Sequence, residues 1–349
     1  MSDTISVAAG DRLLILAPHP DDESIATGGL LQVARELGAS IRVIVLTDGD
    51  NNPWPQRWIE KRWHVGADER KRWGARRREE ARVAMRILGM DDTQMRFFGL
   101  PDLGLTDLLM RASPEPVERL RAELDDFAPT MLVLPALSDL HPDHSAAHIL
   151  LRIALAQADV GVPRMFSFAV HGHAIPGDTV VELDAMQREI KQAAILAHAS
   201  QMRLSRRRFL RYATRSEAYR VIPARPHDNP RLALHARLDA DHRLHIEIEA
   251  KHWRGAARGN SVSVVAQFHA DDALRLIFAL PRQSGDAPIF DAIARREIGT
   301  ARIRFNGDSI SIDLPLPRAG RFREGFVKLG RPQPGLWVLD HCGWQAVAT

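Results

Sequence analysis

The sequence predicts an α/β protein in which a Rossmann-like, three-layer α/β/α domain with a mostly parallel sheet precedes a smaller all-β, sandwich-like domain. Three observations predict this class. Short apolar runs alternate with amphipathic stretches over residues 12–197, as in a parallel sheet covered by helices. Three prolines follow within residues 223–230. Beyond them, hydrophobic residues recur at every second position, which is typical of half-buried antiparallel strands.

The elements of the first domain are expected in a regular order. Strands are predicted at residues 12–16, 41–46, 95–98, 131–134, 165–170 and 179–183. Helices are predicted at residues 28–37, 70–88, 116–127, 145–157 and 184–197. Gly38 and Gly89 stand where helices end. No Gly-x-Gly-x-x-Gly pattern follows the first strand, so a dinucleotide site is not expected.

The change in composition after Ile222 predicts the domain boundaries. The first domain is expected over residues 1–222 and a linker over residues 223–230. An accessory β domain is expected over residues 231–349, and it carries no cluster of residues suited to catalysis.

The composition restricts the class of protein. Hydrophobic residues make up 45% of the chain and charged residues 26%, as in ordinary soluble globular proteins. No apolar run is long enough for a membrane helix, and no signal peptide is visible, so a cytoplasmic protein is expected. The net charge of +3 is weak evidence about partners, and no nucleic-acid-binding motif is found. Arginine clusters occur at residues 70–82 and 203–215, and the first, in which Arg and Glu are interleaved, is interpreted as a solvated helix face, with binding of anionic sugar phosphates as the alternative.

Two clusters of one chemical type follow predicted buried strands. The first follows the apolar run that ends at Leu16, and the second follows the run that ends at Pro135. They read His19-Pro20-Asp21-Asp22-Glu23 and His141-Pro142-Asp143-His144. Ligands of open α/β sheets bind at the carboxyl ends of strands. Histidine and aspartate are usual ligands of a catalytic zinc, whereas the single Cys342 excludes a structural zinc site of the cysteine type. The alternative for each cluster is a polar loop that caps the next helix.

This pair of motifs resembles the PIG-L (LmbE-like) family of zinc-dependent N-deacetylases. Further matches occur in the family's order over residues 10–215. They are Thr47-Asp48-Gly49-Asp50, Arg77-x-x-Glu80-x-x-x-Ala84, Leu100-Pro101-Asp102 and Lys191-x-x-Ala194-x-x-x-His198-x-Ser200-Gln201.

The resemblance implies a role for each of nine residues. The metal ligands would be His19, Asp22 and His144, with zinc as the expected metal and another divalent metal such as iron as the alternative. Asp21 would be the general base. His141 would stabilise the developing oxyanion, and Asp143 would hold its ring. Substrate hydroxyls would be bound by Asp50, Arg77 and Asp102.

The implied activity is hydrolysis of an N-acyl group, most simply the N-acetyl of a glucosamine-type sugar or glycoconjugate. The alternatives are an amidase of the same family that acts on a thiol conjugate, and a non-catalytic carbohydrate-binding protein. The partner is expected to be a small-molecule or glycoconjugate substrate and not nucleic acid, no transmembrane segment is expected, and a homo-oligomer is possible.

Four of the seven tryptophans fall within residues 51–73, directly after Asp50. Packing of an irregular insertion would account for them. A lid, or a platform on which sugar rings stack, is the alternative interpretation.

Overall fold

The computed structural model describes residues 3–171, 178–223, 234–249, 260–268, 273–316, 321–330, 339–340 and 343–349. The chain forms two compact units. The first comprises Met1–Leu105, Glu123–Ala136 and Asp159–Ile222, and the second comprises Thr106–Ala122, Leu137–Ala158 and Pro223–Thr349. Of the predicted linker, only Pro223 lies within the described residues. The domain boundaries predicted from the sequence stay a prediction.

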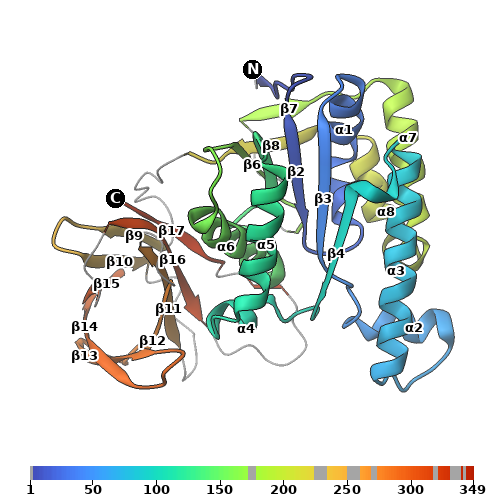
Figure 1. Ribbon diagram of the computed structural model, residues 1–349. Coiled ribbons are helices and arrows are strands. Elements are labelled where there is room, and N and C mark those ends of the chain that lie inside the picture. The colour runs from blue at the N-terminus through green and yellow to red at the C-terminus, as the bar shows by residue number, and fades with distance from the viewer. Residues whose placement is uncertain are drawn as a thin grey trace. The chain divides into compact units, whose positions relative to one another are not determined.

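The first unit contains an eight-stranded sheet in the order β1-β7-β8-β6-β5-β2-β3-β4 (Figure 1). Its strands are β1 (Asp3–Thr4), β2 (Arg12–Ala17), β3 (Ser40–Thr47), β4 (Met95–Leu100), β5 (Met131–Pro135), β6 (Arg164–Phe168), β7 (Thr179–Val181) and β8 (Glu217–Val221). Pairings from β6 through β4 are parallel, whereas β8 runs antiparallel to both β6 and β7. The predicted Rossmann-like, mostly parallel sheet is therefore confirmed.

Helices of the same unit cover one face of this sheet (Figure 1). They are α1 (Asp22–Glu36), α3 (Ala67–Ile87), α7 (Ala185–Ala197) and α8 (Ala199–Ala213), joined by the short α2 (Pro53–Glu60) and the 3₁₀ turn Asp92–Gln94. The helix α1 begins at Asp22, before the predicted start at Gly28, because Ser24 N and Ile25 N already donate to Asp21 O. Neither α2, α8 nor β8 was expected from the periodicity.

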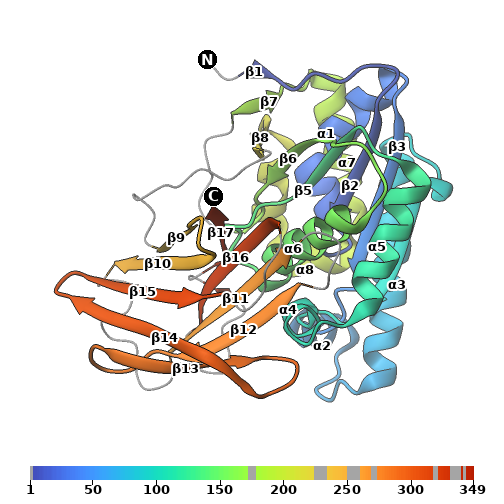
Figure 2. The same cartoon turned by 60° about the vertical axis from the view of Figure 1, so that its left-hand side comes forward.

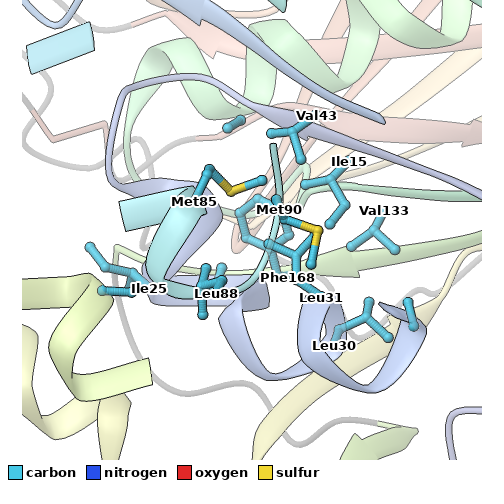
Figure 3. Packing of buried hydrophobic residues seen from close by; sticks show 14 of the residues in the cluster. Ile15, Ile25, Leu30, Leu31, Val43, Met85, Leu88, Met90, Val133 and Phe168 are labelled. Carbon is cyan, nitrogen blue, oxygen red and sulfur yellow. The ribbon is translucent and has the colours of Figure 1, made fainter. Parts of the chain in front are cut away.

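The main core of the first unit lies between the sheet and these helices. Ile15, Val43 and Val133 project from three neighbouring parallel strands, and they lie beside Leu31 of α1 and Met85 of α3 (Figure 3). All five side chains are buried. Strands that carry apolar residues at nearly every position are typical of a parallel sheet, and this is the pattern that the sequence shows.

Two adjacent glycines of α1 differ in how much room they leave. A Cβ on Gly29 would stand 2.4 Å from Leu183 Cδ2 and 3.1 Å from Glu217 Cδ, whereas the nearest atom to a Cβ on Gly28 is Lys191 Cγ at 3.3 Å. The carboxylate of Glu217 cannot easily move, because it accepts hydrogen bonds from Gly29 N at 2.6 Å and Leu30 N at 2.8 Å.

We expect Gly29→Ala to lower the free energy of unfolding by about 1–3 kcal/mol through overpacking, despite the better helix propensity of alanine. Gly28→Ala is the matched control, and it should stay within about 1 kcal/mol of the wild type. Urea unfolding of the two variants measures the difference. Equal stability would show that the contact at Gly29 relaxes without cost.

The second unit contains a closed barrel in the order β10-β15-β14-β13-β12-β11-β16-β17-β9. The strands are β9 (Leu234–Leu238), β10 (Arg243–Glu249), β11 (Ser261–Phe268), β12 (Leu274–Ala279), β13 (Gly285–Asp291), β14 (Glu297–Asn306), β15 (Ser309–Pro315), β16 (Phe322–Gly330) and β17 (Gln345–Ala348) (Figure 2). The expected all-β domain is confirmed. It differs from an open sandwich because β17 pairs in parallel with β9, which joins the two ends of the antiparallel series.

Every second residue of the barrel strands points into its core. Leu244, Ile246 and Ile248 of β10 are buried opposite Ile310 and Ile312 of β15. This alternation is the period-two pattern of the sequence.

The second unit also contains the helical segments α4 (Leu105–Met110), the first part of α5 (Pro114–Phe127) and α6 (Pro142–Gln157). Among the described residues, no helix is both long and apolar enough to cross a membrane.

Candidate metal and catalytic centre

The first motif occupies the turn between β2 and α1. Pro18 O accepts hydrogen bonds from both the backbone nitrogen and the hydroxyl of Thr47, each at 2.9 Å, so the turn is fastened to the end of β3. Asp21 has a φ of 140°, a conformation that side chains other than glycine rarely adopt. Backbone strain of this kind is concentrated at functional sites.

His19 lies between two carboxylates. Its Nδ1 is 3.2 Å from Asp22 Oδ2 and its Nε2 is 3.2 Å from Asp102 Oδ1. All three side chains are buried. Asp102, which was predicted to bind a sugar hydroxyl, also accepts a hydrogen bond from Asn51 N at 2.8 Å. Burial by itself would raise the pKa of Asp102, but hydrogen bonds from His19 and Asn51, together with the charges of His19 and Arg77, outweigh burial and the pKa lies below the usual value.

Asp21 is buried beside a charged arginine. Arg77 Nη2 lies 3.1 Å from Asp21 Oδ2 and also donates to Pro20 O at 2.8 Å. Burial raises the pKa of Asp21 to about 6, even though Arg77 favours the charged carboxylate. A carboxylate with a pKa near 6 suits a general base that works near neutral pH.

Arg77 holds several chain segments together. Besides Asp21 and Pro20, it donates from Nη1 to Gly49 O at 2.6 Å, and its side chain is buried. Gly49 has a φ of 60°, and a Cβ there would lie 1.7 Å from Arg77 Nη1, so this position requires glycine. The predicted contact of Arg77 with substrate stays a prediction, and the structure adds a structural role.

Arg77→Ala is expected to lower the free energy of unfolding by about 2–4 kcal/mol, because it leaves a buried carboxylate and two carbonyls without their donor. Arg76→Ala is the neighbouring control. Arg76 is half-exposed and pairs with Glu80 at 3.1 Å, so its loss should cost no more than about 1 kcal/mol. Urea unfolding compares the two variants, and equal costs would contradict the structural role of Arg77.

Behind Asp21 lies a buried polar group that the sequence interpretation did not assign. Glu23 Oε2 accepts a hydrogen bond from Asp21 N at 2.9 Å. On its other side, Glu23 Oε1 is 3.3 Å from His198 Nε2, which is also 3.0 Å from Ser24 Oγ. Burial lowers the pKa of His198, but the hydrogen bond and charge of Glu23, together with the charge of Asp21, outweigh burial and the pKa is raised. These contacts hold the strained backbone at Asp21.

Asp50 lies half-buried after β3. Burial raises its pKa, and the nearby carboxylates of Asp102 and Asp48 raise it further. Its role as a substrate contact stays a prediction.

The second motif occupies the start of α6 in the second unit. His141 caps this helix, because its Nδ1 accepts a hydrogen bond from Asp143 N at 3.3 Å. The ring centroids of His141 and His144 are 5.3 Å apart, and both side chains are buried. Asp143 was predicted to hold the ring of His141. The contact that the structure shows is made by the backbone nitrogen of Asp143.

Asp139 supports both histidines of the second motif. Its Oδ2 lies 3.2 Å from His144 Nδ1, and its Oδ1 accepts a hydrogen bond from His141 N at 2.9 Å. The sequence interpretation missed Asp139. The position of this carboxylate, two residues before the His-Pro-Asp-His motif, was the one sign in the sequence that Asp139 could support the motif.

The barrel contacts the segment that carries this motif. Arg152 of α6 donates from Nε to both carboxylate oxygens of Glu324 on β16, each at 2.9 Å. Asp340 N donates to Leu140 O, next to His141, at 2.6 Å. Within the second unit, the β domain therefore positions the histidine motif.

Comparison with known proteins agrees with the motifs. Residues 14–155 match the model of the PIG-L family, described as GlcNAc-PI de-N-acetylase. The resemblance seen in the sequence is thereby confirmed, and the matched residues include both histidine motifs.

Two curated proteins that are similar to this chain are 1D-myo-inositol 2-acetamido-2-deoxy-α-D-glucopyranoside deacetylases. The protein from Mycobacterium sp. strain KMS is 31% identical over 169 residues, which cover 44% of this chain and 53% of the relative. The protein from Mycobacteroides abscessus is 28% identical over 236 residues, which cover 56% and 82%. The chain thus spans about half the length of the first relative.

Among solved structures, N,N'-diacetylchitobiose deacetylase from Pyrococcus horikoshii is similar. It has a TM-score of 0.47 and 19% identity, with coverage of 61% of this chain and 84% of the other.

Proposed function

We propose that this protein removes an N-acyl group, most simply acetyl, from a glucosamine-type sugar or glycoconjugate by metal-dependent hydrolysis. The observation that carries the proposal is the buried arrangement around His19, with Asp22 and Asp102 at 3.2 Å on its two ring nitrogens and Asp21 alongside. The names of the curated relatives, which describe deacetylases of an acetamido sugar, support the substrate class.

The sheet topology of the first unit shows where the two strands that precede the motifs end. The strands β2 and β5 are parallel neighbours within the first unit, with Leu13 opposite Met131 and Ile15 opposite Val133. Their carboxyl ends therefore lie at the same edge of the sheet. The first motif follows β2 directly, and the second begins six residues after Pro135. The resemblance of the two motifs to the family adds His144 to His19 and Asp22 as the proposed ligand set.

The donor set suits zinc. Nitrogen and oxygen ligands at about 2.0–2.2 Å in a tetrahedral shell stand roughly 3.3 Å from each other, close to the 3.2 Å between His19 Nδ1 and Asp22 Oδ2. Histidine ligands commonly place their second ring nitrogen on a carboxylate. Asp102 meets this requirement for His19 and Asp139 for His144. His19, Asp22 and His144 would hold the metal, and iron is the alternative occupant.

A bound zinc would supply Lewis acidity, which polarises a carbonyl and lowers the pKa of water to about 7. The protein groups would do the rest. Asp21 takes a proton from water while the oxygen of that water attacks the amide carbon. His141, whose Nδ1 accepts a hydrogen bond from Asp143 N, stabilises the negative charge that develops on the carbonyl oxygen by donating from Nε2. The C–N bond then breaks, the proton passes from Asp21 to the departing amine, and acetate and the free amine are released.

The test is the release of both products by the metal-loaded protein. It is incubated with N-acetylglucosaminyl-inositol, N,N'-diacetylchitobiose and a cysteinyl amide conjugate, and acetate and free amine are measured separately. Equimolar acetate and amine from either acetylated sugar support the proposal. Cleavage of the cysteinyl amide alone would assign a thiol-conjugate amidase instead. Absence of every product with metal bound would favour a carbohydrate-binding protein.

A further inference from the structure

Three tryptophans of the first unit are exposed on and directly after α2. Trp54, Trp58 and Trp63 are 55%, 64% and 83% exposed, whereas Trp73, from the same stretch of sequence, is buried. Trp54 and Trp58 are four residues apart and so lie on one side of the helix, and the buried Pro55 lies between them. Packing of an insertion therefore accounts only for Trp73. Clustered exposed apolar side chains mark an interaction surface.

Three cations lie on α2 or directly after it. The guanidinium of Arg57 lies 5.1 Å above the ring of Trp54, and Lys61 and Arg62 follow the helix. Acidic groups offset the cations only in part, because residues 51–73 contain six arginines and lysines against three acidic residues, Glu60, Asp68 and Glu69. We call this the tryptophan–cation surface. Its residues are Trp54, Arg57, Trp58, Lys61, Arg62 and Trp63.

A second basic element lies next to α2. The helix α2 is in contact with α8. The sequence of α8 contains no Asp or Glu. It carries five arginines, all exposed: Arg203, Arg206, Arg207, Arg208 and Arg211.

We propose that the tryptophan–cation surface docks on an anionic lipid bilayer. Indole rings favour the boundary between headgroups and acyl chains, because one edge is polar and the rest apolar. Lysine and arginine nearby gain about 1 kcal/mol each from an anionic leaflet. A second copy of this chain would bring the same positive charge, which disfavours self-association through this surface. Docking would be peripheral and does not depend on the proposed hydrolase activity.

The test is sedimentation of the full chain with vesicles of phosphatidylcholine, with and without phosphatidylglycerol. We expect binding only to the vesicles with phosphatidylglycerol, a blue shift of tryptophan emission, and weaker binding at high salt. Replacing Trp54, Trp58 and Trp63 together by alanine should weaken binding at least about tenfold. Replacing Arg57, Lys61 and Arg62 by glutamate should weaken it on the order of fivefold per cation.

Two exposed residues outside the surface supply the controls. Met186→Ala removes an exposed apolar side chain and Arg302→Glu reverses an exposed charge, and neither should change vesicle binding. Circular dichroism melts check that each variant is folded. No binding to phosphatidylglycerol vesicles, or undiminished binding of the triple alanine variant, would overturn the proposal. A blue shift of tryptophan emission with soluble chitooligosaccharides, without any vesicle binding, would also overturn the proposal. It would show that the surface binds sugar rings instead.

Discussion

Asp21→Asn is expected to keep its metal and lose about 10²- to 10⁴-fold in turnover, the usual contribution of a positioned general base. Asparagine has nearly the same shape and still accepts a hydrogen bond from Arg77, but it does not take up a proton from water. The variant therefore separates the base from the metal ligands. Acetate release at saturating substrate measures the loss, and elemental analysis measures the metal content.

Asp48→Asn is the control for this substitution. Asp48 is also partly buried, and it pairs with Arg78 at 3.1 Å, but it has no assigned role in the reaction. Its turnover should stay near that of the wild type. Should Asp21→Asn retain full activity with metal bound, another group takes the proton and the assignment of the base is wrong.

His144→Ala is expected to lose the metal and, with it, all measurable activity. Removing one of three protein ligands leaves two, which do not hold zinc at a catalytic site. Elemental analysis of untagged wild-type and variant protein should show about one zinc per chain for the first and little for the second. Treatment of the wild type with a chelator should abolish acetate release, and added zinc should restore it.

Asp139→Asn is expected to have a smaller effect of the same kind. Asp139 touches His144 rather than substrate, so we assign it a positioning role. Loss of such a support lowers metal affinity about 10- to 100-fold without abolishing binding. Activity should therefore recover at high zinc in Asp139→Asn but not in His144→Ala. A zinc content in His144→Ala equal to that of the wild type would remove His144 from the ligand set.

Much of the fold was predictable because its signals are local. Apolar runs at residues 12–16 and 131–134 marked parallel strands, and alternation after Pro230 marked the barrel strands. The two histidine motifs were recognisable for the same reason: each is a continuous segment that follows a strand, where the chemistry of an α/β sheet is expected.

Contacts between distant segments were not predictable in this way. Periodicity shows on which face of a helix or strand a residue lies, but not which residue from a distant part of the sequence contacts it. The tertiary structure decided that Arg77 holds Gly49 and Pro20, and that His198 reaches Glu23 across the first unit. It also decided that β17 pairs with β9, which closes the barrel.

The sequence by itself thus determined the class of fold, the PIG-L motifs and the chemical character of the candidate ligands. Only the tertiary structure decided how those groups are supported. Packing decides three such contacts, which are those of Glu23 with Asp21, Asp102 with His19 and Asp139 with His144. The physical reason is that a buried polar group must find a partner wherever the folded chain supplies one, and that partner need not be near in sequence.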